Sequence, residues 1–274
     1  MNYNNIKISN KQAEKILLDF YHIKGTAFKL PGETDFNFKI SIDSKDCYIL
    51  KISRPNQSKK YSDFQEKLLQ YLEDKTTIVS PKIILDKKRK ATSEYIDSSK
   101  NVRSVRLLTW IPGRLWSNVN PQSNLLRFDL GKQCGKLTKT LRFFKHTEAY
   151  RNFEWDIAQS LWTSNFLHLF SAKEKKVISH FQSLFRKQFK SYQSLRKSIV
   201  HNDVNDNNIV VSEDIKDPKV IGAIDYGDAI HTQTINDLAI ACSYAIMHHN
   251  DPLEASLELV KGYHSTFTLQ EKEI

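Results

Sequence analysis

The spacing of hydrophobic residues changes along the chain, and each change predicts a different kind of element. In residues 8–24 apolar side chains recur every three or four positions, which predicts an amphipathic helix with Ser9 or Asn10 as N-cap and Gly25 as its end. In residues 36–52 they alternate with polar side chains around a central polar turn. This alternation predicts a β-hairpin.

The remaining pattern separates a sheet-rich part from a helical part. We expect a helix at 61–73, then strands at 82–85 and 102–110. Beyond residue 120 we expect a short β region at 198–224 and helices at 124–145, 154–169, 172–194, 237–249 and 252–267. The predicted fold class is therefore α+β with two lobes. A small β-rich N-lobe would span 1–110, and a larger, mainly helical C-lobe would span 111–274.

A polar loop in the predicted C-lobe carries the first candidate chemistry. Residues 201–208 read HNDVNDNN and have an apolar strand on each side. A loop this rich in Asp and Asn is costly to bury unless its side chains are paired or bind something. The pattern H-x-D-x-x-x-x-N supplies what phosphoryl transfer needs. Asp203 would be the carboxylate beside the attacking hydroxyl, and Asn208 would be an oxygen ligand of Mg²⁺.

A second polar turn follows the apolar strand 220–224. Residues 225–228 read DYGD, the D-F-G arrangement with Tyr in place of Phe, so Asp225 would be a second metal ligand. Asp225 follows Asp203 by 22 positions, which leaves room for a hairpin that returns both carboxylates to one end of a sheet. Taken singly, each segment could be an Asx-rich surface turn. Their order, spacing and preceding strands favour a kinase.

Charge and cysteine content limit which partners, cross-links and cell compartment we expect for this chain. The chain has 41 Lys and Arg against 31 Asp and Glu, a net charge of +10, which would attract nucleic acid or polyanionic nucleotides. The basic residues are dispersed, and the one tight run, 87–90, is typical of a solvated turn, so we expect no nucleic-acid partner. Three scattered cysteines predict neither disulfides nor zinc, and favour the cytoplasm. We expect no membrane span and no secretory signal.

Several segments together resemble the aminoglycoside phosphotransferase and choline kinase superfamily. The resemblance is nearest to hydroxylysine kinases and to the phosphotransferase domain of some bacterial proteins fused to a class III aminotransferase. The matching segments are 30–38 (LPGETDFNF), 48–52 (YILKI), 105–113 (VRLLTWIPG), 152–156 (NFEWD), 201–208, 224–228, 237–241 and 262–264. They are spread from residue 30 to residue 264, so the resemblance extends over nearly the whole chain. The resemblance implies the two-lobed protein-kinase-like fold.

The resemblance also implies how a nucleotide, ATP or GTP, would be held. Lys51 would be the N-lobe lysine that meets the phosphates. Gly32 to Phe38, a segment that includes Asp35, would be the hairpin that covers them. Leu108 to Trp110 would be the hinge, whose backbone hydrogen-bonds the nucleobase.

Other positions match the superfamily less simply. The resemblance implies that Asp237 braces the catalytic loop, although it could equally cap a helix. Asn202 stands where the superfamily usually has glycine. Asp228 has no fixed role in the kinase template, and it could bind a second metal, bind a substrate amine or cap the next helix. The acidic partner of Lys51 is open among residues 63–66, where the pattern aligns Gln65 instead of an acid.

The expected reaction is Mg²⁺-dependent transfer of a nucleotide γ-phosphoryl group to a hydroxyl. The resemblance implies an amino alcohol or amino acid as acceptor, similar to hydroxylysine or ethanolamine, and Asp206 and Asp228 would suit a cationic amine. The alternatives are an aminoglycoside phosphotransferase and a catalytically silent nucleotide-binding module of a larger protein. Residues 262–274 read as one helix ending and another beginning, so we also expect a truncated C-lobe with further domains.

Overall fold

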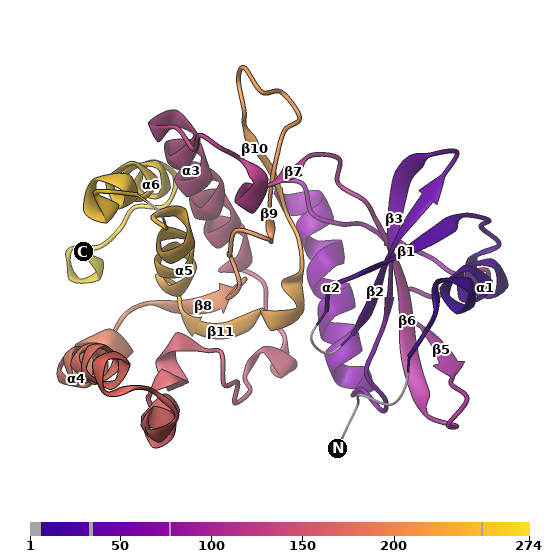
Figure 1. The fold of residues 1–274 in the computed structure, drawn as a ribbon, viewed down its shortest axis with the longest axis horizontal. Coiled ribbons are helices and arrows are strands. Elements are labelled where there is room, and N and C mark those ends of the chain that lie inside the picture. Colours follow the sequence, from indigo (N-terminus) through magenta and orange to yellow (C-terminus); the bar gives the residue numbers. More distant parts are fainter. Residues whose placement is uncertain (1–6, 33–34, 77, 248) are drawn as a thin grey trace. The chain divides into compact units, whose positions relative to one another are not determined.

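The computed structural model of the chain forms two compact units, one rich in strands and one rich in helices (Figure 1). The structure describes residues 7–32, 35–76, 78–247 and 249–274. The first unit comprises residues 1–75 and 79–113, and the second comprises 76–78 and 114–274. This arrangement confirms the predicted α+β class with a small sheet-rich lobe and a larger helical lobe.

Within its described residues, the first unit contains one antiparallel six-stranded sheet. The strand order is β1-β2-β3-β6-β4, and β5 also pairs with β6. The elements of this unit are α1 (Asn10–Tyr21), β1 (Thr26–Leu30), β2 (Phe36–Ile42), β3 (Lys45–Ile52), α2 (Lys59–Lys75), β4 (Ile83–Ile84), β5 (Ser93–Ile96) and β6 (Val102–Thr109).

Helix α1 begins as predicted and ends earlier than predicted. Ser9 is the N-cap in a capping box with Gln12. The helix closes at His22, which adopts a left-handed conformation with φ 58° and donates its backbone N–H to Leu18. Gly25 therefore does not end the helix. A Cβ atom there would lie 2.9 Å from the Ile40 side chain, so glycine allows the chain to pass close to β2.

The predicted hairpin is confirmed as β2 and β3. Its two-residue loop, Asp43 and Ser44, has φ angles of 48° and 64°, as in a type I′ turn. The strands β1 and β5 were not predicted. In β1 only Ala27 is buried, and in β5 only Ser93, so neither strand shows a clear alternation of apolar and polar residues.

Helix α1 packs on one face of the sheet and fixes which strand residues point away from it. The core formed with α1 includes Leu17, Phe38, Leu50 and Ile52, none of which is exposed. Successive side chains of a strand point to opposite faces. Lys51, between Leu50 and Ile52, therefore lies on the face of the sheet opposite α1.

The second unit combines helices with two small sheets. In its described residues the sheets have the orders β10-β9-β7 and β11-β8. The elements are β7 (Arg114–Leu115), α3 (Asn124–Leu141), α4 (Ala172–Gln193), β8 (Lys197–Val200), β9 (Ile209–Val211), β10 (Val220–Ala223), β11 (Ile230–Gln233), α5 (Asn236–Ala245), α6 (Pro252–Thr266) and the 3-10 helices η2 (Trp116–Asn118), η3 (Thr147–Ala149), η4 (Ile157–Leu169), η5 (Tyr226–Asp228) and η6 (Glu271–Glu273).

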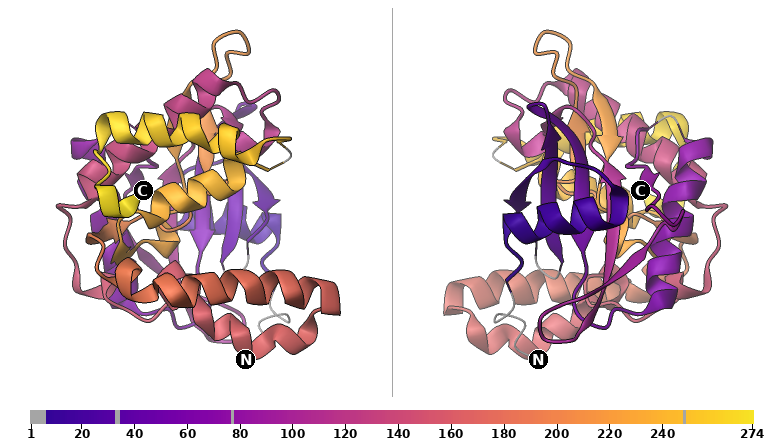
Figure 2. Two further views of the ribbon diagram at one scale, coloured as in Figure 1. Left: turned by 90° about the vertical axis from the view of Figure 1, so that its left-hand side faces the viewer. Right: turned by 90° about the vertical axis from the view of Figure 1, so that its right-hand side faces the viewer.

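Helices α3 and α6 pack closely together within this unit, and α4 lies apart from both (Figure 2). The close approach depends on glycine, because a Cβ atom on Gly131 would lie 1.8 Å from the backbone oxygen of Leu259. No helix in the described part of the chain has both the length and the apolarity needed to cross a bilayer.

Two helical predictions in this unit need correction. The α-helix expected at 154–169 is instead the 3-10 helix η4, in which no residue is buried. It therefore lacks the apolar face packing that stabilises most α-helices in proteins. The helix expected to begin within 262–274 is only the short 3-10 turn η6.

Candidate active site

The loop at 201–208 is anchored at both ends by buried strands. It follows β8, where Ile199 and Val200 are buried, and it leads into β9, whose three residues are all buried. The polar loop therefore begins and ends at positions fixed by the core.

Asp237 holds the start of this loop from the first turn of α5. Its carboxylate accepts the backbone N–H of His201 at 2.9 Å and that of Asn202 at 2.8 Å. Asp237 is 1% exposed, and burial raises the pKa of its carboxyl group. Asn202 has φ 65°, a conformation that asparagine tolerates better than most residues. Asp237 thus contacts the loop directly and is not the N-cap of α5, which is Ile235.

Side chains within the loop position the carboxylate of Asp203. Asn208 donates from Nδ2 to Asp203 Oδ2 at 2.6 Å, and Asn205 donates from Nδ2 to Asp203 Oδ1 at 2.7 Å. Burial raises the pKa of Asp203, and the nearby charge of Asp225 raises it further, whereas His201 and these hydrogen bonds lower it. The result is a half-buried carboxylate held at both oxygens.

The turn at 225–228 is tied to the same loop. Ile224 donates its backbone N–H to Asn208 O at 2.9 Å, and the His201 ring contacts Ile224 O at 3.0 Å. Asp225 follows with φ 58° and ψ 70°, a left-handed conformation that turns the chain directly after β10. The structure therefore brings together the three residues predicted to act in transfer and metal binding, which are Asp203, Asn208 and Asp225.

The donor atoms in this cluster suit Mg²⁺. The Asn208 amide nitrogen faces Asp203, so its amide oxygen points away from that carboxylate, and the Asp225 side chain is exposed. Magnesium is commonly held by one or two protein oxygens together with phosphates and water. Among the described residues, no group of three or more His, Cys, Asp or Glu side chains is arranged to hold a metal. A site built from Asn208 and Asp225 would use phosphate oxygens to complete its coordination.

Asp228 is the unusual member of the cluster. It is half-buried, and no described residue donates a hydrogen bond to its carboxylate or forms an ion pair with it. Burial, followed by the charges of Asp203 and Asp225, raises the pKa of Asp228 to about 6, while His201 and Arg151 act in the opposite direction. Its role could not be assigned from the sequence, because its effect depends on these neighbours.

Lys51 belongs to the first unit, near the end of β3. It is in register with Asn37 on β2 and with Arg106 on β6, so these three residues share one face of the sheet. Arg106 is only 4% exposed and was not predicted as a site residue. The signal that could have found it is an arginine inside the otherwise apolar run V-R-L-L, because a buried arginine needs a partner.

The candidates for the partner of Lys51 lie on α2. Gln65 is buried, and its Oε1 accepts no hydrogen bond from the described residues. The pKa of Glu66 is raised by burial and by Asp63, and the charge of Arg106 lowers it. Glu66 is therefore coupled electrostatically to Arg106, which is in register with Lys51, and also to Lys67.

The predicted phosphate-covering hairpin contains a glycine with no room for a side chain. A Cβ atom on Gly32 would lie 2.5 Å from the backbone oxygen of Asp35. Asp35 accepts the backbone N–H of Arg54 at 3.2 Å, which connects this segment to the end of β3. Glu33 and Thr34, between them, lie outside the described residues.

The predicted hinge is already engaged in the sheet. Leu108 is buried and lies in register with Ile49 on β3. Thr109 donates its backbone N–H to Lys82 O, and Trp110 donates its own to Cys47 O, both at 2.9 Å. A nucleobase would therefore have to use other backbone groups of this segment, such as carbonyls or the residues after Trp110.

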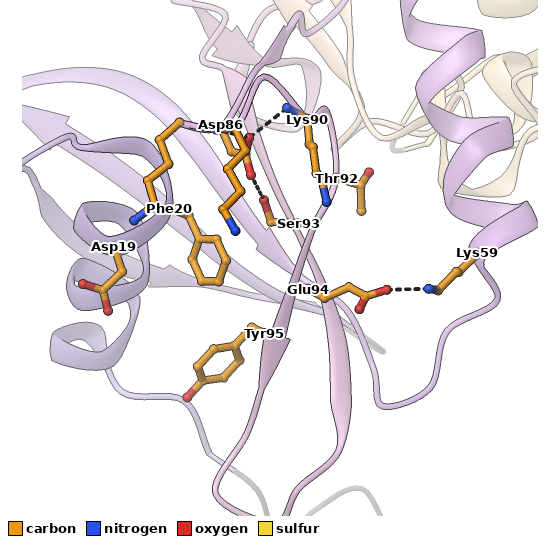
Figure 3. Close-up of a pocket in the computed structure, with 11 residues that line it drawn as sticks. Asp19, Phe20, Lys59, Asp86, Lys90, Thr92, Ser93, Glu94 and Tyr95 are labelled. Carbon is orange, nitrogen blue, oxygen red and sulfur yellow. Dashed lines mark hydrogen bonds and ion pairs between the residues drawn. The ribbon is translucent and has the colours of Figure 1, made fainter.

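The first unit also contains a cavity of about 760 Å³, lined by the turn at 86–90, strand β5 and the end of α1 (Figure 3). Two of its acidic groups are already engaged. Glu94 pairs with Lys59 at 2.7 Å, and Asp86 accepts the Ser93 hydroxyl at 2.6 Å. None of the residues predicted to contact the nucleotide lines this cavity.

The sequence and the fold place the chain among known phosphotransferases. A model of the phosphotransferase enzyme family matches residues 28–271. The chain belongs to this family. It is 27% identical to the hydroxylysine kinase of Xenopus laevis over 300 residues, which cover 100% of this chain and 79% of the frog protein. The family predicted from the sequence is thereby confirmed.

Solved structures support the same fold. A microcompartment-associated aminopropanol kinase is similar with a TM-score of 0.75 and 16% identity, over 94% of this chain and 82% of that one. An amicoumacin kinase in complex with AMP-PNP and Ca²⁺ is similar with a TM-score of 0.73 and 18% identity, over 96% and 79%. The protein is a small-molecule phosphotransferase that acts on a hydroxyl group.

Proposed function

We propose that the protein transfers the γ-phosphoryl group of ATP or GTP to the hydroxyl of an amino alcohol or amino acid in a Mg²⁺-dependent reaction. The observation that carries this proposal is the clustering of Asp203, Asn208 and Asp225 on two connected turns. It supplies a positioned carboxylate beside two oxygen ligands, which is the arrangement that phosphoryl transfer requires.

Asp203 is proposed to orient the acceptor hydroxyl and accept its proton. Its two oxygens are fixed by Asn205 and Asn208, so the carboxylate would meet the hydroxyl in a defined direction. Partial burial raises the pKa of Asp203 and makes it a stronger base than an exposed aspartate. Mg²⁺, held by Asn208 and Asp225, would supply charge neutralisation at the phosphates.

The first unit is proposed to bind the nucleotide. Lys51 would contact the phosphates from the face of the sheet opposite α1, with Gly32 and Asp35 in the covering hairpin. Leu108 and Trp110 would border the nucleobase. The position of Lys51 on this face supports the assignment, because its cation would favour a polyanion. The second unit would then contribute the catalytic loop and the acceptor site.

The proposal that the acceptor is an amino alcohol rests on the names of the similar proteins and on the negative charge of the candidate site. Hydroxylysine kinases and an aminopropanol kinase, by their names, act on hydroxylated amines. Three carboxylates, those of Asp203, Asp225 and Asp228, lie within electrostatic range of one another in this chain. Such a cluster would attract a cationic acceptor. An aminoglycoside, which is also cationic, is the second candidate acceptor.

Two measurements test the proposal. Thermal shift with ATP and GTP, with and without Mg²⁺, should show stabilisation that depends on both nucleotide and metal. An acceptor screen with 5-hydroxylysine, ethanolamine, choline, homoserine and an aminoglycoside should show one class that stimulates nucleoside diphosphate release. Nucleotide binding without transfer to any acceptor would instead support a catalytically silent module.

A further inference from the structure

Two buried or half-buried acceptors near the catalytic loop lack a donor. The Asp228 carboxylate has no hydrogen-bond or ion-pair partner among the described residues. Asn202 is 4% exposed, and its Oδ1 is buried without a hydrogen-bond partner. For Asn202 Oδ1, removal from water without a donor costs free energy, and most native structures leave few such atoms. A ligand that supplies N–H donors would satisfy both groups.

One short segment connects the surroundings of these two acceptors. Arg151 donates from Nη1 to Ala229 O at 2.7 Å, directly after Asp228. Four residues later, Trp155 O accepts the Asn202 side-chain amide at 3.4 Å, directly before Asp203. The segment from Arg151 to Trp155 therefore spans from the end of the 225–228 turn to the start of the catalytic loop.

The same amide contact explains why Asn202 Oδ1 lacks a partner. The Nδ2 atom of Asn202 is used by Trp155 O, and its backbone N–H is used by Asp237. The amide is therefore held in one orientation, with its oxygen as the remaining polar atom.

From this geometry we propose that Asp228 and Asn202 form a subsite for the primary ammonium group of the acceptor. The proposal rests on the proposed function and specifies which residues select an amine. The ammonium would donate to the Asp228 carboxylate and to Asn202 Oδ1, while the acceptor hydroxyl lies at Asp203. Trp155 is 66% exposed, and its indole would border the aliphatic part of the acceptor.

A second metal ion is the competing occupant of Asp228. Asn208 and Asp225 would already supply oxygen ligands for Mg²⁺, which usually takes only one or two protein carboxylates. A primary ammonium needs three acceptors, and Asp228 together with Asn202 Oδ1 can provide them. The unpartnered amide oxygen therefore favours the ammonium.

The test is equilibrium binding by calorimetry to protein loaded with Mg²⁺ and AMP-PNP. The probes are 1-amino-2-propanol and 5-hydroxylysine, with 1,2-propanediol as the neutral analogue. The variants are Asp228→Asn and Asn202→Gly, the second chosen because glycine keeps the left-handed backbone. Glu213→Gln, an exposed carboxylate on the β9–β10 hairpin, is the matched control.

Asp228→Asn should weaken binding of the better amine probe by about tenfold or more, because a charge-assisted hydrogen bond is lost. Asn202→Gly should weaken it about threefold to tenfold. Neither variant should change AMP-PNP affinity or binding of the diol. Unchanged amine affinity in Asp228→Asn would overturn the subsite. A variant that needs more Mg²⁺ than the wild type but binds the amine equally well would also overturn it.

Amine binding, compared with phosphoryl transfer, also distinguishes the proposed reaction from the proposed ammonium subsite. Amine binding that depends on Asp228 but leads to no phosphoryl transfer would support the subsite and contradict the proposed reaction. Transfer to an acceptor without dependence on Asp228 would support the reaction and overturn the subsite. If neither amine probe binds the wild-type protein, the subsite is also overturned.

Discussion

Asn208 donates two hydrogen bonds from its side-chain nitrogen to Asp203, one to the carboxylate at 2.6 Å and one to the backbone oxygen at 2.9 Å. This pairing fixes the direction of both side chains. The carboxylate is held for the acceptor, and the Asn208 amide oxygen is directed away from it. The two proposed roles, proton acceptance and metal binding, therefore depend on the same contact.

Replacement of Asn208 should change the metal requirement more than the nucleotide affinity. Asn208→Leu removes both the amide oxygen and the hydrogen bonds to Asp203, so we expect the Mg²⁺ concentration for half-maximal transfer to rise about tenfold or more. The measurement is a Mg²⁺ titration of transfer at saturating nucleotide. Asn207→Ala, at the exposed neighbouring position, is the control. An unchanged Mg²⁺ requirement in Asn208→Leu would remove Asn208 from the metal site.

Lys51 should matter for nucleotide binding through its charge. Lys51→Met keeps most of the length of the side chain and removes the ammonium, so we expect nucleotide affinity to fall about tenfold. Titration calorimetry with Mg²⁺ and AMP-PNP measures this change. Lys45→Met, an exposed lysine at the start of the same strand, should bind normally. Equal affinities for the two variants would argue against the phosphate role of Lys51.

Asp237 should be important for stability. Its carboxylate satisfies two backbone N–H groups of the catalytic loop, and Asp237→Ala would leave both without a partner. We expect a loss of about 2–5 kcal/mol in the free energy of unfolding. Urea denaturation measures it, with Asp214→Ala on the exposed hairpin as control. A loss below about 0.5 kcal/mol, the size typical of a surface substitution, would contradict the bracing role.

The raised pKa of Asp228 predicts a pH dependence of stability. Because the folded state holds this proton more tightly than the unfolded state, the free energy of unfolding should fall as pH rises from 3.8 to about 6. Asp228→Asn should therefore be more stable than the wild type above pH 6, by roughly 1 kcal/mol after solvent screening is allowed for. The two proteins should converge near pH 4.

Thermal or urea denaturation across this range, in buffer without metal or nucleotide, checks the prediction. An Asp228→Asn variant that is less stable than the wild type at pH 7 would show that the carboxylate has a stabilising partner in the folded protein.

The sequence predicted the elements whose patterns are regular. The β2–β3 hairpin alternates clearly around its turn, and HNDVNDNN has a distinctive spacing, so the fold class and the residues that lie together at the catalytic loop could both be predicted. Strand β1 could not, because only one of its residues is buried. Local periodicity reports burial, and it is weak where burial is slight.

Properties that depend on long-range contacts could not be predicted. The state of Asp228 is set by Asp203, Asp225 and burial, which no local pattern reveals. The position of Arg106 beside Lys51 follows from strand register, and register is fixed only when the sheet forms. The sequence therefore identified chemical groups better than it identified their neighbours.

The central claim is best tested by acceptor-dependent release of ADP or GDP, measured for the wild type and Asp203→Asn at saturating Mg²⁺. The account predicts that the variant loses turnover by about a thousandfold or more and keeps its nucleotide-dependent thermal shift, because proton acceptance and alignment are lost while nucleotide binding is not. Near-normal turnover in Asp203→Asn, with an acceptor that the wild type phosphorylates, would contradict it.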